Sequence, residues 1–332
     1  MRNSNFEVLR IIAIIMITAY HYSVHGVVDV DNVSGGGKFL LNLVSLWGKA
    51  GVNIFSLITG YFMIENENIC YSKLIKLESQ VLFYSMSGLL VGISLGIEMP
   101  WLSMFFPIIT NQYWYITAFF LVYLLSPYIN KMIRSLNINE FNNLVILLFV
   151  LWSIIPFFTF QRSKGFFWNQ FIWFVVMYIS GAYLKLNKPR YSKKIYKMIF
   201  FISNIILVGS CLLVNFASIY YEMPRQMATY CAWSNTPIVT AMCISLIRIA
   251  ELKVPYFNKT INIFASLVIG IYLFQENYVF SRLCWYEWFN NSLPITIIQK
   301  TVHFLYSILM VCLIGGIIEY IRIRVFFKLL KL

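Results

Sequence analysis

The stretch LRIIAIIMITAYHYSVHG, residues 9–26, is apolar over most of its length. A helix needs about 20 largely apolar residues to cross a bilayer, and residues 6–26 meet that requirement. The exceptions are Arg10 near the start of the stretch, and His21 and His25 near its end. Ionisable groups are costly inside a membrane, so we expect these three to serve a specific purpose there.

The composition extends this expectation to the whole chain. Hydrophobic residues make up 60% of the 332 residues and charged residues only 12%. A soluble protein would need a largely polar exterior, so lipid must be the solvent for most of this chain. We predict an all-α fold, a polytopic membrane helix bundle of about 10 transmembrane helices that forms a single domain over residues 1–332. The expected spans lie near residues 6–26, 39–63, 74–97, 112–133, 141–160, 168–186, 195–219, 233–252, 260–282 and 301–322.

Lys and Arg residues are unevenly distributed between the two sides of this bundle. With the N-terminus in the cytoplasm, 18 of the 26 basic residues fall inside and 6 outside, while Arg10 and Lys49 lie within spans. The positive-inside rule predicts such a bias. We therefore expect both termini in the cytoplasm and the protein in the cell membrane, the inner membrane of a bacterium. The net charge of +13 suits anionic membrane lipid and requires no nucleic-acid partner.

The polar residues of the first span share one edge of the helix. His21 lies eleven positions after Arg10, so at about 100° per residue both project from nearly the same side, close to Glu7, Thr18 and His25. Along the axis they are about 16 Å apart. An arginine can hold phosphate, and a neutral imidazole can take a proton from a hydroxyl near pH 7. This separation fits a long donor molecule held by its phosphates near Arg10, with its reactive end near His21.

Each of these groups also has a plainer interpretation. Arg10 lies near a helix end and can extend to the interface, and a buried polar side chain can simply bond to a neighbour. His21 and His25, at i and i+4, have a spacing that suits zinc. The third histidine, His303, lies at the outer start of the last span, and carboxylates are few there. We predict no metal site.

Further polar side chains occur in the second, fourth and ninth spans. They are Lys49 in WGKAGVNIFSLITGYFM (47–63), Trp114 and Tyr115 in NQYWYITAFFLVYLLSPYIN (111–130), and Gln275, Glu276 and Asn277 in GIYLFQENYV (270–279). We expect Glu276 to orient a histidine or to balance an arginine, with a structural ion pair as the alternative. In the third span, Gly88, Gly92 and Gly96 repeat every four residues, which predicts close helix packing.

Four of these segments, in this order along the chain, resemble the membrane acyltransferase 3 family. They are R-x10-H in the first span, GVNIFSLITGYF in the second, YWYI…YLLSPYIN in the fourth and GIYLFQEN in the ninth. The resemblance covers roughly residues 4–285. It implies transfer of an acyl group, commonly acetyl from acetyl-CoA, to a hydroxyl of a cell-surface glycan. It also implies that His21 is the base and Arg10 its essential motif partner.

The chain departs from the family pattern at two places. Many relatives have GIYLIH where this chain has GIYLFQ, so Gln275 replaces a histidine. Lys73 and Lys76, in YSKLIKLESQ, stand where relatives often have arginines. Lysine keeps the positive charge but cannot bind an anion through the bidentate fork of arginine.

Together these observations predict an integral membrane O-acyltransferase with no permanently bound cofactor. The acyl group, most simply acetyl, would move from cytoplasmic acyl-CoA to a hydroxyl of a cell-surface or lipid-linked polysaccharide. The predicted residues are His21, Arg10 and Glu276 for catalysis, Arg10, Lys49, Lys73 and Lys76 for the acyl-CoA donor, and His25, Trp114, Tyr115, Gln275 and Asn277 for the acceptor.

The alternative is a transporter or flippase of lipid-linked glycans that performs no acyl transfer. Such a protein would also need a polar cavity within a bundle of many spans. The sequence has no repeated halves of the kind that indicate inverted-repeat transporters, and the R-x10-H edge beside the ordered motifs favours the enzyme.

Overall fold

The computed structural model describes residues 2–26, 35–160, 169–221, 225–293 and 296–329. Within these ranges every regular element is a helix, so the all-α prediction is confirmed. The chain divides into two compact units, each assembled from separate parts of the sequence. The first unit contains residues Met1–Gly48, Ser72–Trp114 and Phe257–Leu332, and the second contains Lys49–Tyr71 and Tyr115–Tyr256.

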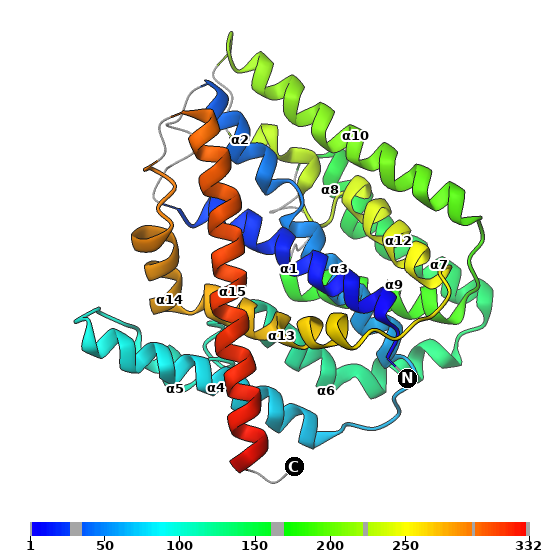
Figure 1. Cartoon of the computed structure of the whole chain (residues 1–332). Helices are drawn as coiled ribbons and strands as arrows, with labels where there is room; N and C mark the ends of the chain where they lie inside the picture. The colour runs from blue at the N-terminus through cyan, green and yellow to red at the C-terminus, as the bar shows by residue number, and fades with distance from the viewer. Residues whose placement is uncertain (1, 27–34, 161–168, 222–224, 294–295, 330–332) are drawn as a thin grey trace. The chain divides into compact units, whose positions relative to one another are not determined.

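The helices of the first unit come from both ends of the chain and from one internal segment (Figure 1). They are α1 (Ser4–Val24), α2 (Gly35–Ser45), α4 (Tyr71–Ser94), α5 (Trp101–Phe105), α13 (Lys259–Glu276), α14 (Tyr278–Arg282), a π-helical segment (Leu283–Trp288) and α15 (Ile297–Leu329). Helix α1 packs against α2, α13 and α15, and α13 packs against α15.

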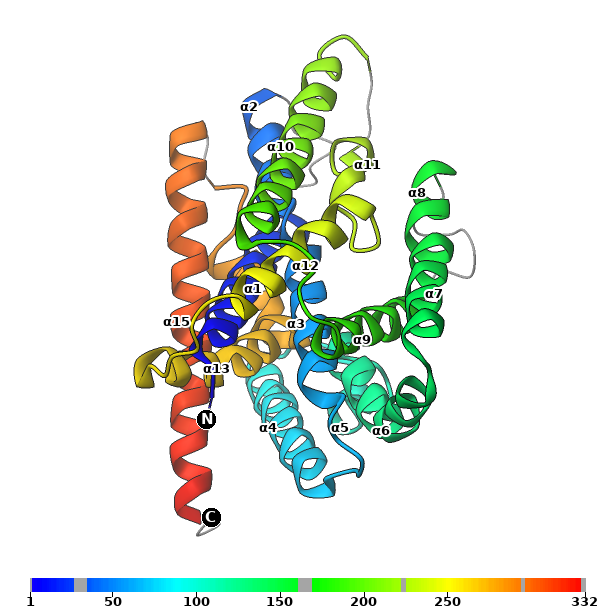
Figure 2. The same cartoon turned by 90° about the vertical axis from the view of Figure 1, so that its right-hand side faces the viewer.

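The second unit consists mainly of the middle of the chain. Its helices are α3 (Gly48–Met63), α6 (Trp114–Ser135), α7 (Ile138–Phe149), a π-helical segment (Val150–Ile154), α8 (Ile155–Phe158), α9 (Gln170–Leu186), α10 (Lys193–Ala217), α11 (Arg225–Ala228), a short 3₁₀ turn (Tyr230–Ala232) and α12 (Pro237–Glu251). Helices α10 and α12 lie side by side (Figure 2), and α7 packs against α9.

Each of the ten expected spans contains a helix in the structure, but the helices differ in length. Within the described part of the chain, seven are long and apolar enough to cross a membrane, and the bent pair α13–α14 would make an eighth. Helix α9 has 17 residues and α12 has 15, both shorter than a typical span. The structure therefore supports a multi-pass membrane protein, and the figure of ten crossings stays a prediction.

Helices α1 and α13 run side by side in the same direction (Figure 1). At their N-terminal ends, the Ser4 hydroxyl donates to Asn262 Oδ1 at 3.1 Å and accepts from the backbone N–H of Asn258 at 2.8 Å. At their C-terminal ends, His21 meets Glu276. Because both ends are paired, residues far apart in the sequence are held together at the ends of these two helices.

The chain bends by 74° where α13 ends and α14 begins, and Asn277 stabilises this break. Its Oδ1 accepts from the backbone N–H groups of Val279 and Phe280, which caps α14. Its Nδ2 donates to the carbonyl of Tyr84 at 3.1 Å and to the hydroxyl of Tyr113 at 2.9 Å. The free backbone groups of a broken helix need such partners inside a membrane protein.

Two glycines of α4 allow this helix to approach the break closely. A Cβ on Gly88 would lie 2.3 Å from Oδ1 of Asn277, and one on Gly92 would lie 3.0 Å from a methyl group of Val279. The expected packing role is confirmed for these two. It is wrong for Gly96, which follows the end of α4 with a φ of 65° and permits a turn that other residues rarely adopt.

In the second unit, Gly60 of α3 and Gly181 of α9 bring two helix backbones into contact. A Cβ on Gly60 would lie 1.9 Å from the carbonyl oxygen of Tyr178, and one on Gly181 would lie 2.2 Å from that of Leu57. Backbone atoms cannot move aside as the end of a side chain can. Small residues at such crossings are a common means of packing membrane helices.

We expect Gly60→Ala and Gly181→Ala to destabilise the protein by about 1–3 kcal/mol each, the usual effect of overpacking. Gly209→Ala in α10 is the matched control, because no described atom outside its own helix lies within 4 Å of the added Cβ. Melting temperatures in detergent, followed by size-exclusion chromatography, provide the measurement. Equal melting temperatures for all three variants would contradict the close approach of α3 and α9.

Candidate active site

The polar edge of α1 faces the interior of the first unit. Glu7, Thr18 and His21 are buried, whereas Ile12 and Ile15 on the remaining surface are exposed. A membrane helix that buries its polar side chains and exposes isoleucine is arranged for a lipid surrounding. The inward edge predicted from the spacing of these residues is therefore confirmed for these three side chains.

Near the C-terminal end of α1, His21 contacts the last residue of α13. Its Nε2 lies 2.8 Å from Oε1 of Glu276, and the two side chains are only 7% and 14% exposed. His25, one turn further along, has its Nε2 3.8 Å from the same oxygen. The two imidazole rings meet edge to face, with centroids 4.8 Å apart. Glu276 was expected to contact either a histidine or an arginine, and the structure shows it in contact with a histidine.

This contact determines which nitrogen of His21 can accept a proton. An ionised carboxylate is only an acceptor, so Nε2 must donate its hydrogen to Glu276. In the neutral ring the lone pair then lies on Nδ1. Nδ1 is buried and has no hydrogen-bond partner among the described residues. His21 is thus an oriented imidazole with one unsatisfied basic nitrogen.

Two sources of negative charge lie close to the ring of His21. The Glu276 carboxylate is in direct contact with it. His21 lies in the last turn of α1, and Glu276 is the last residue of α13. The C-terminal end of a helix carries partial negative charge, which stabilises cations. These groups would stabilise the imidazolium that forms when Nδ1 takes a proton.

A cluster of aromatic rings holds the end of α1 in place. The hydroxyl of Tyr22, which is buried, lies 3.0 Å from Nδ1 of His303 on α15. The ring of Tyr22 also meets those of Trp285 and Phe304 edge to face. His303 is therefore bound to the residue next to His21, and does not join His21 and His25 around Glu276.

Arg10, at the other end of α1, pairs with Glu7. Its NH1 lies 2.9 and 3.0 Å from the two carboxylate oxygens of Glu7. Arg2 also contacts this carboxylate, at 3.4 Å. The arginine side chain remains 27% exposed. The structure thus separates the two members of the motif: His21 has a carboxylate partner from α13, and Arg10 has one from its own helix.

Comparison with known proteins identifies the family. A family model described as an acyltransferase domain, that of the acyltransferase 3 family, matches residues 3–320. The chain belongs to the acyltransferase 3 family. A search of curated proteins and a search of solved structures each gave no match. The family predicted from the four motifs is therefore confirmed, and with it a membrane acyltransferase.

In this acyltransferase, the lysines predicted to bind the donor lie in different places. Lys73 and Lys76 are exposed on the first turns of α4, in the first unit. Lys49 belongs to the second unit, where its Nζ lies 6.0 Å from the ring centroid of Trp233, a cation–π distance. Of the three lysines predicted to bind the donor, Lys73 and Lys76 therefore belong to the first unit, and both are exposed.

The acceptor residues predicted in the fourth span are likewise divided between the units. Trp114 begins α6 and ends a segment of the first unit. Tyr115 belongs to the second unit, where its ring packs 6.0 Å from that of Phe55 and 5.4 Å from that of Phe174. A role for these two residues in acceptor binding stays a prediction.

Gln275 and Asn277 flank Glu276 but differ in how their amides are satisfied. Asn277 uses both its oxygen and its nitrogen to stabilise the helix break. Gln275 is fully buried, and neither end of its amide has a hydrogen-bond partner in the described ranges. An unpaired buried amide costs about 1–3 kcal/mol, so Gln275 would gain from a polar ligand.

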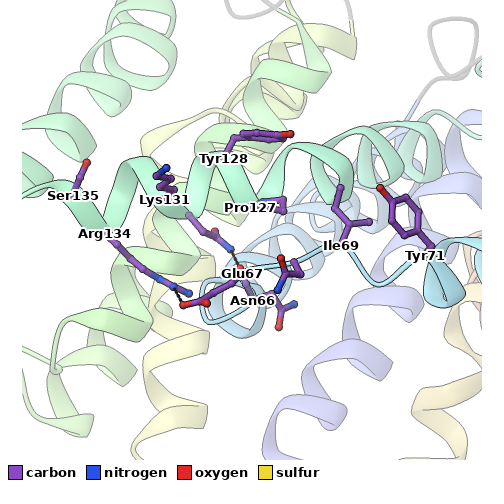
Figure 3. A pocket seen from close by; sticks show the side chains of 11 residues that line it. Asn66, Glu67, Ile69, Tyr71, Pro127, Tyr128, Lys131, Arg134 and Ser135 are labelled. Atoms are coloured by element: carbon purple, nitrogen blue, oxygen red, sulfur yellow. Dashed lines mark hydrogen bonds and ion pairs between the residues drawn. The ribbon is translucent and has the colours of Figure 1, made fainter.

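The second unit contains a pocket of about 770 Å³ between α6 and the turn after α3 (Figure 3). Arg134 donates to Glu67 at 2.8 Å and to the carbonyl of Ile64 at 2.6 Å. Asn130, from the SPYIN motif, donates to the carbonyls of Met63 and Asn66. These bonds hold the turn against α6, so we interpret the pocket as structural.

The first unit contains a buried charged cluster that was not predicted from the sequence. Glu319 of α15 is 1% exposed and accepts from Gln80 at 3.0 Å and Tyr84 at 3.1 Å, both on α4. Arg322 binds the same carboxylate through Nε at 2.9 Å and NH2 at 2.6 Å. A Cβ on Gly270 of α13 would lie 2.5 Å from this side chain. A glutamate within an apolar span was the signal that would have identified it.

Proposed function

We propose that this protein moves an acyl group, most simply acetyl, from cytoplasmic acyl-CoA to a hydroxyl of a cell-surface or lipid-linked polysaccharide. The observation that carries the proposal is the contact between His21 and Glu276 in a member of an acyltransferase family. It gives the imidazole a fixed orientation and leaves Nδ1 able to accept a proton. Deprotonation of an alcohol is the step that acyl transfer to a hydroxyl requires.

The reaction would proceed through proton transfer at Nδ1 of His21. The acceptor hydroxyl gives its proton to Nδ1 as its oxygen attacks the thioester carbonyl. The new carbon–oxygen bond forms, the carbon–sulfur bond breaks, and CoA leaves as thiolate, which recovers the proton from the imidazolium. Glu276 keeps the ring oriented and stabilises its positive charge while the proton resides there.

The donor would be held near the start of α1. Among the described residues, Arg10 binds Glu7 through its NH1 nitrogen alone. Its Nε and NH2 are therefore available for phosphate oxygens. Lys73 and Lys76, on helix α4 of the same unit, would add positive charge. Lys49 is a further donor residue that we propose from its sequence motif. The positive-inside bias supports a start of α1 at the cytoplasmic surface, where acyl-CoA is available, and we propose a bacterial inner membrane.

The acceptor would approach the C-terminal end of α1. His25, which is 43% exposed, is the accessible side chain of the histidine pair. The unpaired amide of Gln275 would bind a sugar hydroxyl, because that would satisfy a buried polar group. Trp114 and Tyr115 are the further acceptor residues that we propose, on the basis of their family motif. Asn277, whose amide is engaged at both ends, would act by holding the helix break next to Glu276.

The test uses purified protein in lipid nanodiscs, radiolabelled acetyl-CoA and a crude pool of surface glycans and lipid-linked oligosaccharides. We expect release of free CoA together with label in the glycan fraction. Movement of unmodified lipid-linked glycan across the bilayer, without use of acetyl-CoA or a longer acyl-CoA, would instead support the flippase. Measuring both in one preparation distinguishes the two functions.

We expect Glu276→Gln to lower the rate of transfer about fivefold, because a charge-assisted hydrogen bond is replaced by a neutral one worth about 1 kcal/mol less. Glutamine keeps an acceptor for Nε2 of His21, so ring orientation is largely preserved. The initial rate of CoA release at saturating acetyl-CoA provides the measurement. An unchanged rate would show that Glu276 does not assist His21.

A further inference from the structure

His21, His25 and Glu276 bring three metal-binding groups to one point of the first unit. Their ligand atoms, two imidazole nitrogens and one carboxylate oxygen, all lie within 4.8 Å of one another. The sequence predicted no metal site, because the third histidine, His303, lies at the outer start of the last span and carboxylates are few there. The structure removes that objection, since α13 supplies Glu276 from more than 250 positions away in the sequence.

The distances suit a small tetrahedral ion. Bonds of about 2.0–2.2 Å to nitrogen and oxygen place neighbouring ligands about 3.3 Å apart. Oxygen Oε1 of Glu276 lies 2.8 Å from Nε2 of His21 and 3.8 Å from Nε2 of His25, on either side of that value. All three ligand atoms lie within 4.8 Å of one another, so rotation of the side chains, above all of the partly exposed His25, would close them around an ion. Two histidines and a glutamate, with one position left open, form a common zinc ligand set.

We propose that His21, His25 and Glu276 form a binding site for a divalent transition metal of the Zn²⁺ type, and that occupancy of this site inhibits acyl transfer. Two imidazoles and one carboxylate favour zinc and its neighbours over Mg²⁺ and Ca²⁺, which prefer oxygen ligands alone. The exposed side of His25 offers a route for the ion. The inhibitory part rests on the proposed function, whereas metal binding does not.

Inhibition follows from which ring nitrogen of His21 carries a hydrogen when the metal is bound. A metal-bound neutral imidazole uses the lone pair of one ring nitrogen and carries hydrogen on the other. With Nε2 bound to the metal, Nδ1 would hold a hydrogen and could not accept a proton from the acceptor hydroxyl. Glu276 would at the same time be taken away from His21 as its hydrogen-bond acceptor. Metal binding therefore leaves His21 without a nitrogen that can act as the base.

Direct binding of Co²⁺, used as a visible substitute for Zn²⁺, tests the site without an activity assay. We expect the detergent-purified full chain to bind one equivalent of Co²⁺ with the absorption of a tetrahedral ion, and Zn²⁺ to displace it. His25→Ala should weaken binding more than 100-fold, beyond the roughly 10–100-fold typical of changes around a ligand set. Because His25 is 43% exposed, this variant should fold normally.

His303→Gln serves as the matched control, because it alters the remaining histidine of the chain and keeps a partner for Tyr22. It should bind Co²⁺ as the wild type does. Absence of Co²⁺ binding in the wild type, or equal affinity in His25→Ala, would overturn the site. So would loss of binding in His303→Gln at full folded yield.

Inhibition is measured separately, as CoA release across a Zn²⁺ titration with and without a chelator. We expect the concentration of Zn²⁺ that halves the rate to be at least tenfold higher in His25→Ala than in the wild type, relative to each variant's own metal-free rate. Bound zinc without loss of rate would overturn the inhibitory role. Metal binding in a protein that uses no acyl donor would leave the site standing and reject the proposed function.

Discussion

Replacing His21 with alanine is expected to slow acyl transfer by about 10²–10⁴-fold, the contribution typical of a positioned general base. The imidazole is the group whose free nitrogen can take the acceptor proton, and alanine offers no substitute. Transfer of label from acetyl-CoA to the glycan pool, with equal amounts of folded protein, measures this effect.

His21→Ala also removes the 2.8 Å contact between His21 and Glu276, so a second variant separates chemistry from stability. His21→Gln keeps a side chain of similar reach whose amide can donate to the carboxylate, but an amide cannot act as a base. We expect His21→Gln to restore the melting temperature and not the rate. Wild-type rates in both variants would show that His21 is not the base.

Replacing Glu319 with leucine is expected to have the largest effect on stability, about 3–5 kcal/mol, because it removes the carboxylate that binds the largely buried guanidinium of Arg322 through two nitrogens. The carboxylate is nearly inaccessible and accepts from Gln80 and Tyr84 as well as from Arg322. We expect a lower melting temperature in detergent and a smaller folded fraction after extraction from the membrane.

The double variant, Glu319→Leu with Arg322→Leu, provides the control. Removing both partners of a buried ion pair is often nearly neutral, whereas removing one is costly. We therefore expect the double variant to be more stable than Glu319→Leu alone. A double variant less stable than either single variant would show that the two charges do not act as a pair.

The polar groups of α1 show which features of the site could be predicted from the sequence. The period of a helix placed Glu7, Thr18 and His21 on one edge, and the cost of burying them in lipid indicated that this edge faces inward. That reasoning is local, because it depends only on residues a few turns apart. It could not reveal that NH1 of Arg10 would bind Glu7, or that Nε2 of His21 would bind Glu276.

Glu319 could have been predicted from the sequence as a buried polar group, but it was not. It is a single carboxylate in a long apolar segment, and the rule that was applied to the first span applies equally to the last. Its partners on α4 are more than 230 positions away, so their identity depends on how α4, α13 and α15 pack. The length of α9 and α12 also needed the structure, because hydropathy does not fix where a short helix begins and ends.

By itself, the sequence determined that this protein is all-helical, lipid-embedded and a member of the acyltransferase 3 family. Those properties follow from composition, from periodicity and from motifs within single helices. Only the tertiary structure decided which carboxylate meets His21, which nitrogen of its ring remains basic and that His25 joins them. The physical reason is distance along the chain: such contacts arise from the parallel packing of α1 against α13, and no local pattern encodes that register.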